Sequence, residues 1–217
     1  MFPLILTLAL ATPAAAPPDG TYNYVSAMNG TTIAKTVITV KREESGSVVL
    51  SENGSGNMNG QKGSIQDTLT LDPALAPSAY ASLASLGDSK SMKSTLVFNG
   101  TQATQSGDVN KKYDLVADAK HFVLMDFGPF TGFFALPAQM HAWSQPPVIA
   151  IIPMYAHAMP LTVDAALKPA RPASVPATDE QISFNNMVQI TLWYDPQTLI
   201  VDELDVPSQG VVVKRTP

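Results

Sequence analysis

The chain has 217 residues, of which 14% are charged, and its 18 acidic and 13 basic residues give a net charge of −5. This length suffices for one large β domain or two small ones, and for a substantial core without disulfides or metal. The negative charge argues against binding to nucleic acid or to an anionic lipid surface. Cysteine is absent, which excludes a disulfide framework and a lipidated cysteine and suits an exported bacterial protein.

The first sixteen residues have the pattern of an export signal. An apolar run over residues 2–11 precedes Ala14, Ala15 and Ala16, the small residues typical of a cleavage site, although the usual positively charged start is missing. The run is too short to span a bilayer of about 30 Å. We therefore predict a signal peptide over 1–16, a single β-rich domain over 17–217, and a periplasmic or secreted location in a bacterium. An uncleaved anchor or a misassigned start is the alternative.

The first half of the domain reads as a series of short strands separated by turn signals. Asn29, Asn53 and Asn99 each precede a glycine and predict hairpin turns, because both central residues of a type I′ turn need positive φ. Each Asn-Gly pair is followed by Ser or Thr, so N-glycosylation is the alternative, which a bacterial signal disfavours. A Gly/Asn-rich loop is expected from 53 to 63. The predicted strands are 21–27, 31–41, 47–52, 64–71, 95–99, 112–117 and 121–126.

One helix is predicted within this series, over residues 73–86. Asp72 would cap it, Pro73 would begin it and Gly87 would end it. Apolar residues from Leu75 to Leu86 recur between these ends at helical spacing. A second segment, 130–143, is ambiguous, because its aromatic residues could line a helix that Pro137 would start or kink.

The C-terminal third contains further strands and a proline-rich loop. Strands are predicted over 148–152, 159–165, 187–194, 199–206 and 210–215, with a β-turn at Asp195-Pro196 and a mobile connection over 168–180. No βαβ rhythm is visible. We therefore predict a mainly β protein, a single strongly curved antiparallel sheet (an incomplete barrel) with one or two short helices over its open face.

The closing residues 192–215, LWYDPQTLIVDELDVPSQGVVVKR, resemble the last strands of the periplasmic lipoprotein-carrier (Lol-like) superfamily and its uncharacterised bacterial exported relatives. In that superfamily an Asp-Pro turn precedes strands that complete an incomplete barrel, and the opening strand from Gly20 to Tyr24 fits the same order. The resemblance implies an apolar cavity for acyl chains and no catalytic residues. Those carriers use an arginine at the cavity mouth, and none of Arg42, Arg171 and Arg215 can be matched to it.

Residues 121–163 are the least polar part of the chain. Asp126 is their only formal charge, and they hold five of the eight Phe and four of the nine Met. The prolines in this segment argue against a stable membrane span. Such residues usually form core, but their density on irregular chain also suits an adaptable apolar pocket. The pocket candidates are Phe122, Phe127, Phe130, Phe133, Phe134, Met140, Trp143, Met154 and Tyr155.

Three functions are compatible with this pattern. The first is a non-catalytic binding module for an apolar small molecule or lipid, without a cofactor. The second is an envelope adaptor that binds another exported protein. The third is a hydrolase component with His121, His141 or His157 as base, although spacings of 20 and 16 residues lack the tight pairs of metal sites. Asp202, Glu203 and Asp205 could pair as acid and base, but successive strand residues point to opposite faces. Glu203 and Asp205, which share a face, are expected on a solvated strand face.

Overall fold

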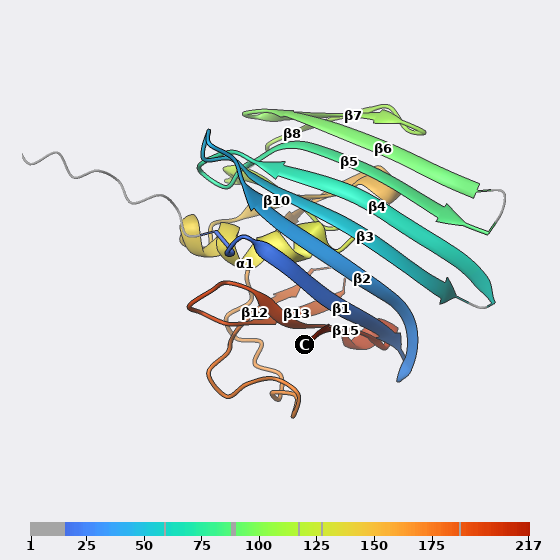
Figure 1. Cartoon of the computed structure of the whole chain (residues 1–217). Coiled ribbons are helices and arrows are strands. Elements are labelled where there is room, and N and C mark those ends of the chain that lie inside the picture. Colours follow the sequence, from blue (N-terminus) through green and yellow to red (C-terminus); the bar gives the residue numbers. More distant parts are fainter. Residues whose placement is uncertain (1–15, 59, 88–89, 117, 127, 187) are drawn as a thin grey trace, which may run out of the picture.

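The computed structural model describes residues 16–58, 60–87, 90–116, 118–126, 128–186 and 188–217. Twelve antiparallel strands form one large curved sheet in the order β12-β13-β14-β15-β1-β2-β3-β4-β5-β6-β7-β8 (Figure 1). Pairing of β1 with β15 joins the two ends of the domain. The strands are β1 (Gly20–Met28), β2 (Thr31–Arg42), β3 (Val48–Met58), β4 (Gln61–Leu71), β5 (Pro77–Leu86), β6 (Lys90–Asn99), β7 (Gln102–Gly107), β8 (Lys111–Asp114), β12 (Glu180–Asn185), β13 (Gln189–Tyr194), β14 (Val201–Val206) and β15 (Val211–Thr216).

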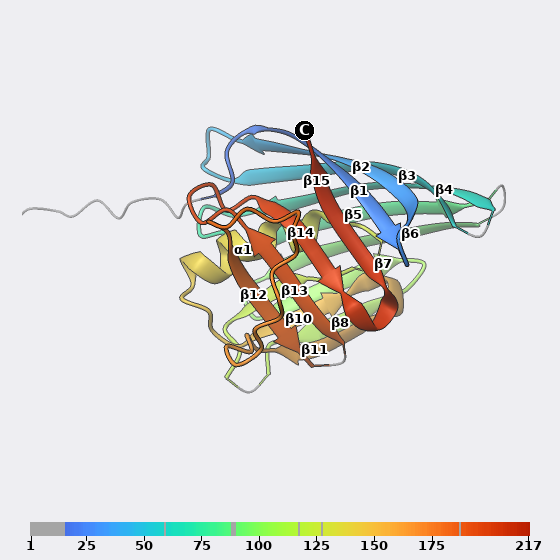
Figure 2. The same cartoon turned by 90° about the horizontal axis from the view of Figure 1, so that it is seen from below.

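A second layer lies on the concave side of this sheet (Figures 1 and 2). It contains β9 (His121–Leu124), α1 (Thr131–Ala142), β10 (Val148–Ile152), the 3-10 turn η1 (Pro153–Tyr155) and β11 (His157–Leu161). β10 lies between β9, to which it is parallel, and β11, to which it is antiparallel. The expectation of no βαβ unit was therefore wrong at one place, because α1 is the crossover that parallel neighbours require.

The predicted fold class is confirmed: the protein is mainly β, and its large sheet curves around the second layer without closing into a barrel in the described residues. The ambiguous segment 130–143 is helical and continues through Pro137. Every residue from Thr131 to Met140 is buried. A helix that is apolar on all sides belongs in a core, and tertiary packing supplies the stability that its proline reduces.

The helix predicted over 73–86 is wrong, and this stretch forms a turn followed by β5. The capping chemistry of Asp72 is present, since its carboxylate accepts N–H groups of Ala74 and Ala76 at 2.8 and 2.9 Å. Leu75 then adopts a left-handed φ of 64°, which ends right-handed helix after one turn. The residues beyond pair with β4 and β6, and these sheet hydrogen bonds prevail over the helical spacing.

Two of the three Asn-Gly turns are confirmed. Asn29 and Gly30 have φ of 49° and 79° between β1 and β2, and a turn after Asn99 joins β6 to β7. The third is wrong, because Asn53 and Gly54 lie inside β3, and the expected loop to residue 63 is two long strands. A Cβ at Gly54 would lie 3.0 Å from Thr36 Oγ1, so this glycine serves close packing between strands.

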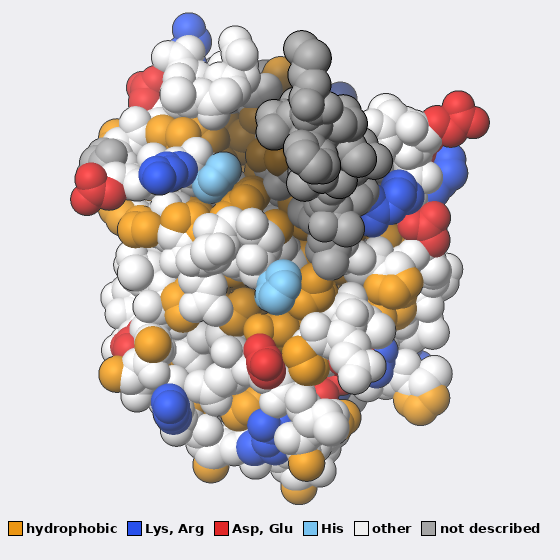
Figure 3. Space-filling view, turned by 90° about the vertical axis from the view of Figure 1, so that its left-hand side faces the viewer, with side chains coloured by type: hydrophobic (Ala, Val, Ile, Leu, Met, Phe, Trp, Pro, Cys, Tyr) orange, Lys and Arg blue, Asp and Glu red, His pale blue; other side chains and the backbone are white. Residues whose placement is uncertain are grey.

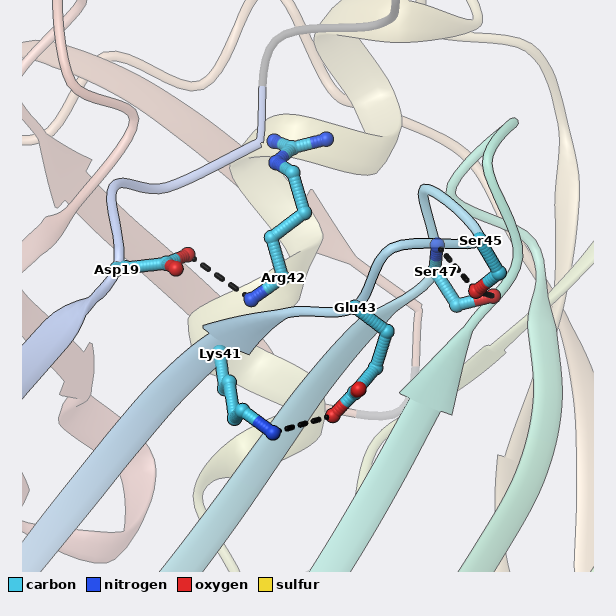
Figure 4. A network of polar contacts seen from close by, with 6 residues as sticks. All are labelled: Asp19, Lys41, Arg42, Glu43, Ser45 and Ser47. Atoms are coloured by element: carbon cyan, nitrogen blue, oxygen red, sulfur yellow. Dashed lines mark hydrogen bonds and ion pairs between the residues drawn. The ribbon is translucent and has the colours of Figure 1, made fainter.

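A surface network joins the start of the domain to the β2–β3 hairpin (Figure 4). The Asp19 carboxylate accepts the backbone N–H of Arg42 at 3.0 Å, and Lys41 pairs with Glu43 at 2.9 Å. Both partners of the ion pair are exposed, so the pair contributes at most about 1 kcal/mol. In the described part of the chain, no helix is long and apolar enough to cross a membrane.

Candidate functional site

An apolar pocket of about 270 Å³ lies between the small sheet and the β13 end of the large sheet. Six of its lining residues belong to the apolar segment 121–163, and the others come from beside β13 and from the 3-10 turn η2 (Pro207–Gln209). The lining residues are Met125, Ile152, Tyr155, His157, Met159, Leu161, Val188, Ile190 and Gln209.

Strand alternation explains how this lining arises. Alternate residues of β11, namely His157, Met159 and Leu161, line the pocket from one side, as alternation along a strand requires. Val188 and Ile190 do the same from the opposite side. The inner end of the pocket is buried, whereas Tyr155 is 64% exposed and His157 and Gln209 are also exposed at its mouth.

Eight of the nine residues singled out from the sequence are described, and they lie in three places. Tyr155 lines the pocket, and Met154 lies beside it in η1. Trp143 stacks on His121 with ring centroids 4.0 Å apart. Phe127 lies outside the described residues. The remaining five are buried in the core in and around α1, and they are Phe122, Phe130, Phe133, Phe134 and Met140.

Sequence reasoning missed most of the lining, including Met125, Ile152 and Met159. The signal that could have found it is the alternation over 157–161 on a hairpin strand, which the aromatic density upstream obscured. On the face of the molecule shown in Figure 3, hydrophobic side chains lie among neutral polar ones, with charged side chains of both signs scattered between them.

A group of buried acids lies elsewhere, beneath the start of α1. The helix has no side-chain cap of its own at Phe130. Glu52 of β3 supplies it, because its Oε2 accepts the backbone N–H groups of Phe130 and, at 3.1 Å, Thr131. The Thr131 hydroxyl donates to Asp67 of β4. Glu52 and Asp67 are cross-strand neighbours and only 2% and 4% exposed.

The surroundings of these two carboxyl groups favour one proton held between them. Burial, followed by the charge of Asp67, raises the pKa of Glu52 well above its ordinary value. Burial also raises the pKa of Asp67 to about 6, against the opposing hydrogen bonds from Glu52 and Thr131. Glu52 Oε1 and Asp67 Oδ1 have no other partner among the described residues, and a proton between them satisfies both.

The buried acids hold the second layer in place. Asp126 accepts the backbone N–H of Met154 at 3.2 Å and the Tyr80 hydroxyl at 3.4 Å, so it ties η1 to β5. Neither Glu52, Asp67 nor Asp126 lines either described pocket. Through these hydrogen bonds the carboxyl groups position α1 and η1.

A polar pocket of about 440 Å³ lies where β14, β15 and β1 meet the loop 164–179. The expectation of a solvated acidic strand is wrong here. Glu203 is 2% exposed and contacts Ser174 at 2.6 Å and Lys214 at 3.2 Å. The pairing of β13 with β14 skips Asp202 at a register shift, so strict alternation does not hold. Asp202 instead pairs with Arg215 at 2.6 Å.

The three histidines lie on separate elements, in β9, at the end of α1 and in β11. No group of three or more His, Asp or Glu able to hold a metal ion occurs within the described ranges. The structure therefore brings no histidine together with a metal-ligating cluster there.

No family model and no curated protein matches the chain. Its fold is similar to a solved beta-barrel-like protein of the domain of unknown function DUF1849 from Brucella abortus, with a TM-score of 0.55 and 9% identity over 94% of this chain and 97% of that one. A DUF1089 family protein from Pseudomonas aeruginosa aligns with a TM-score of 0.49 and 9% identity over 93% and 97% of the two chains. At this identity the first likeness shows the fold alone, that of uncharacterised bacterial β-barrel-like proteins.

Proposed function

We propose that this protein is an exported, non-catalytic binding module for an apolar ligand such as a lipid or acyl chain. The observation that carries the proposal is the pocket of about 270 Å³ between β11 and β13, which is lined almost wholly by aliphatic, methionine and aromatic side chains. Methionine adapts its shape to irregular ligands, and a concave apolar site with a few polar groups is typical of small-molecule binding.

The packing of the fold interior limits where an apolar ligand could bind. In a carrier with a hollow barrel the ligand would occupy the concave side of the sheet, where this chain packs α1 and β9–β11. The apolar ligand is therefore assigned to the gap beside β11. The similarity of residues 192–215 to the Lol-like carriers supports an acyl ligand, and residues 1–16 support export.

The test is ligand binding to the purified mature chain. Mass spectrometry of an organic extract should reveal a co-purified apolar molecule, and an environment-sensitive apolar dye should bind and be displaced by single-chain lipids. Met159→Trp would fill the pocket and should weaken dye binding at least about tenfold, a difference of about 1.4 kcal/mol.

The matched control is Met92→Trp, since Met92 on β6 is 46% exposed and lies outside the pocket lining. It should bind the dye like the unaltered chain. Equal binding by both variants would place the ligand elsewhere, and failure of every apolar probe to bind would overturn the proposal.

A further inference from the structure

We propose that the ligand of this pocket is a free fatty acid, a single-chain amphiphile whose carboxylate is bound at the mouth by Lys111. The inference rests on the proposed function and specifies the head group that the same site recognises. It comes from the charge at the mouth and from the volume behind it.

Lys111, on the edge strand β8, is held beside the η1 turn by two contacts. Its Nζ donates to the carbonyl of Ala156 at 2.7 Å, and Ala156 lies in sequence between the lining residues Tyr155 and His157. Nζ also lies 5.5 Å from the centroid of the Tyr113 ring. The ammonium is therefore one residue away from two exposed lining residues of the pocket.

The backbone of the η1 turn creates this position. Ala156 has a left-handed φ of 47°, and its N–H closes the turn onto the carbonyl of Pro153 at 3.0 Å. Its own carbonyl accepts from Lys111. An ammonium has three N–H donors, and the hydrogen bond to Ala156 uses one, so two can reach a carboxylate. No carboxylate of the described residues forms an ion pair with Lys111.

The other groups at the mouth agree with a carboxylate head. His157 and Gln209 are exposed lining residues, and each has an N–H group that can donate to an oxygen. The two acids nearest to Lys111 along the chain bind elsewhere, since Asp108 accepts the backbone N–H of Lys93 and Asp114 accepts from the Gln102 side chain. Asp126 is 5% exposed and accepts from Met154 N–H and the Tyr80 hydroxyl. The mouth is therefore cationic and donor-rich, although the chain as a whole carries a charge of −5.

The volume of the pocket limits the ligand to one acyl chain. About 270 Å³ is just below the range of about 300–1,000 Å³ for sites that enclose drug-sized ligands. Ile152, Leu161 and Ile190 form its buried end. A single acyl tail fits this space with its head at the opening, whereas two tails would not.

The experiment compares dodecanoic acid, dodecanol and dodecylamine by displacement of the bound dye at a pH where the acid is ionised. The acid should bind most tightly and the amine least. Lys111→Met should weaken binding of the acid about two- to fivefold, the effect of an exposed ion pair, and leave binding of the alcohol unchanged. Lys112→Met is the control, because Lys112 follows on the same strand and points to the opposite face.

The outcomes separate this inference from the function on which it rests. If the acid and the alcohol bind equally and Lys111→Met changes neither, the head-group assignment fails while apolar binding stands. If none of the three binds, the proposed function fails and the inference with it. Binding to phosphatidylglycerol vesicles without displacement by dodecanoic acid would point to a membrane surface instead and would also overturn it.

Discussion

The two halves of the apolar segment 121–163 differ in aromatic content and in surroundings. In the first half, residues 122–124 of β9 and 131–140 of α1 are buried beneath the large sheet. In the second half, η1 and β11 present one face to the protein and the other to a pocket. Aromatic density therefore marks the core in this fold, whereas the pocket is built from methionine and aliphatic residues that alternate along a hairpin.

Shortening one side chain in each half should show the largest difference in stability between the two halves. Phe134 is fully buried and contacts Tyr22 and Tyr24 with ring centroids 5.4 and 6.1 Å apart. Phe134→Ala should lower the free energy of unfolding by about 3–5 kcal/mol, because it leaves a cavity in packed core. Met159→Ala should cost about 1 kcal/mol or less, since it borders existing space. Urea denaturation measures both, and equal losses would show that the two halves do not differ in packing.

The attachment of α1 to the sheet can be tested next. Glu52→Ala removes the acceptor of two buried N–H groups at the helix start, and the free energy of unfolding should fall by about 3 kcal/mol. Glu52→Gln keeps an acceptor of similar shape and should cost less. If both variants lost the same stability, the cap would not be the reason for the effect.

The shared proton predicts a pH dependence in the same region. The pKa of Asp67 rises from 3.8 to about 6 on folding. Below about pH 4 both states hold the proton; between about pH 4 and 6 only the folded state does. The contribution of Asp67 to the free energy of unfolding should therefore fall as the pH rises through this window, by at most about 3 kcal/mol.

Asp67→Asn cannot titrate and should show a shallower fall between about pH 4 and 6. Asp179→Asn is the matched variant on the outer face, where burial and Asp202 raise the pKa of Asp179 to about 7. It should reduce the pH dependence up to about pH 7 in the same direction. Denaturation curves across this range check both, and an unchanged slope in Asp67→Asn would contradict the shared proton.

Local chemistry explains which elements were predictable. The turns at Asn29 and Asp195 depend on residues within a few positions of each other, and both occur where the sequence indicates them. At Asp72, local chemistry predicts the capping contact but not the element that follows it. Its carboxylate caps the backbone as predicted, yet whether a helix or a strand follows depends on β4 and β6, which lie outside the local window.

The sequence by itself determined the β class, the curved open sheet and the apolar character of residues 121–163, because composition, alternation and turn residues act locally. Only the tertiary structure decided that α1 fills the concave side, that Glu52 and Asp67 share a proton beneath it, and that β11 and β13 enclose a pocket. Each of these depends on residues distant in the chain meeting in space.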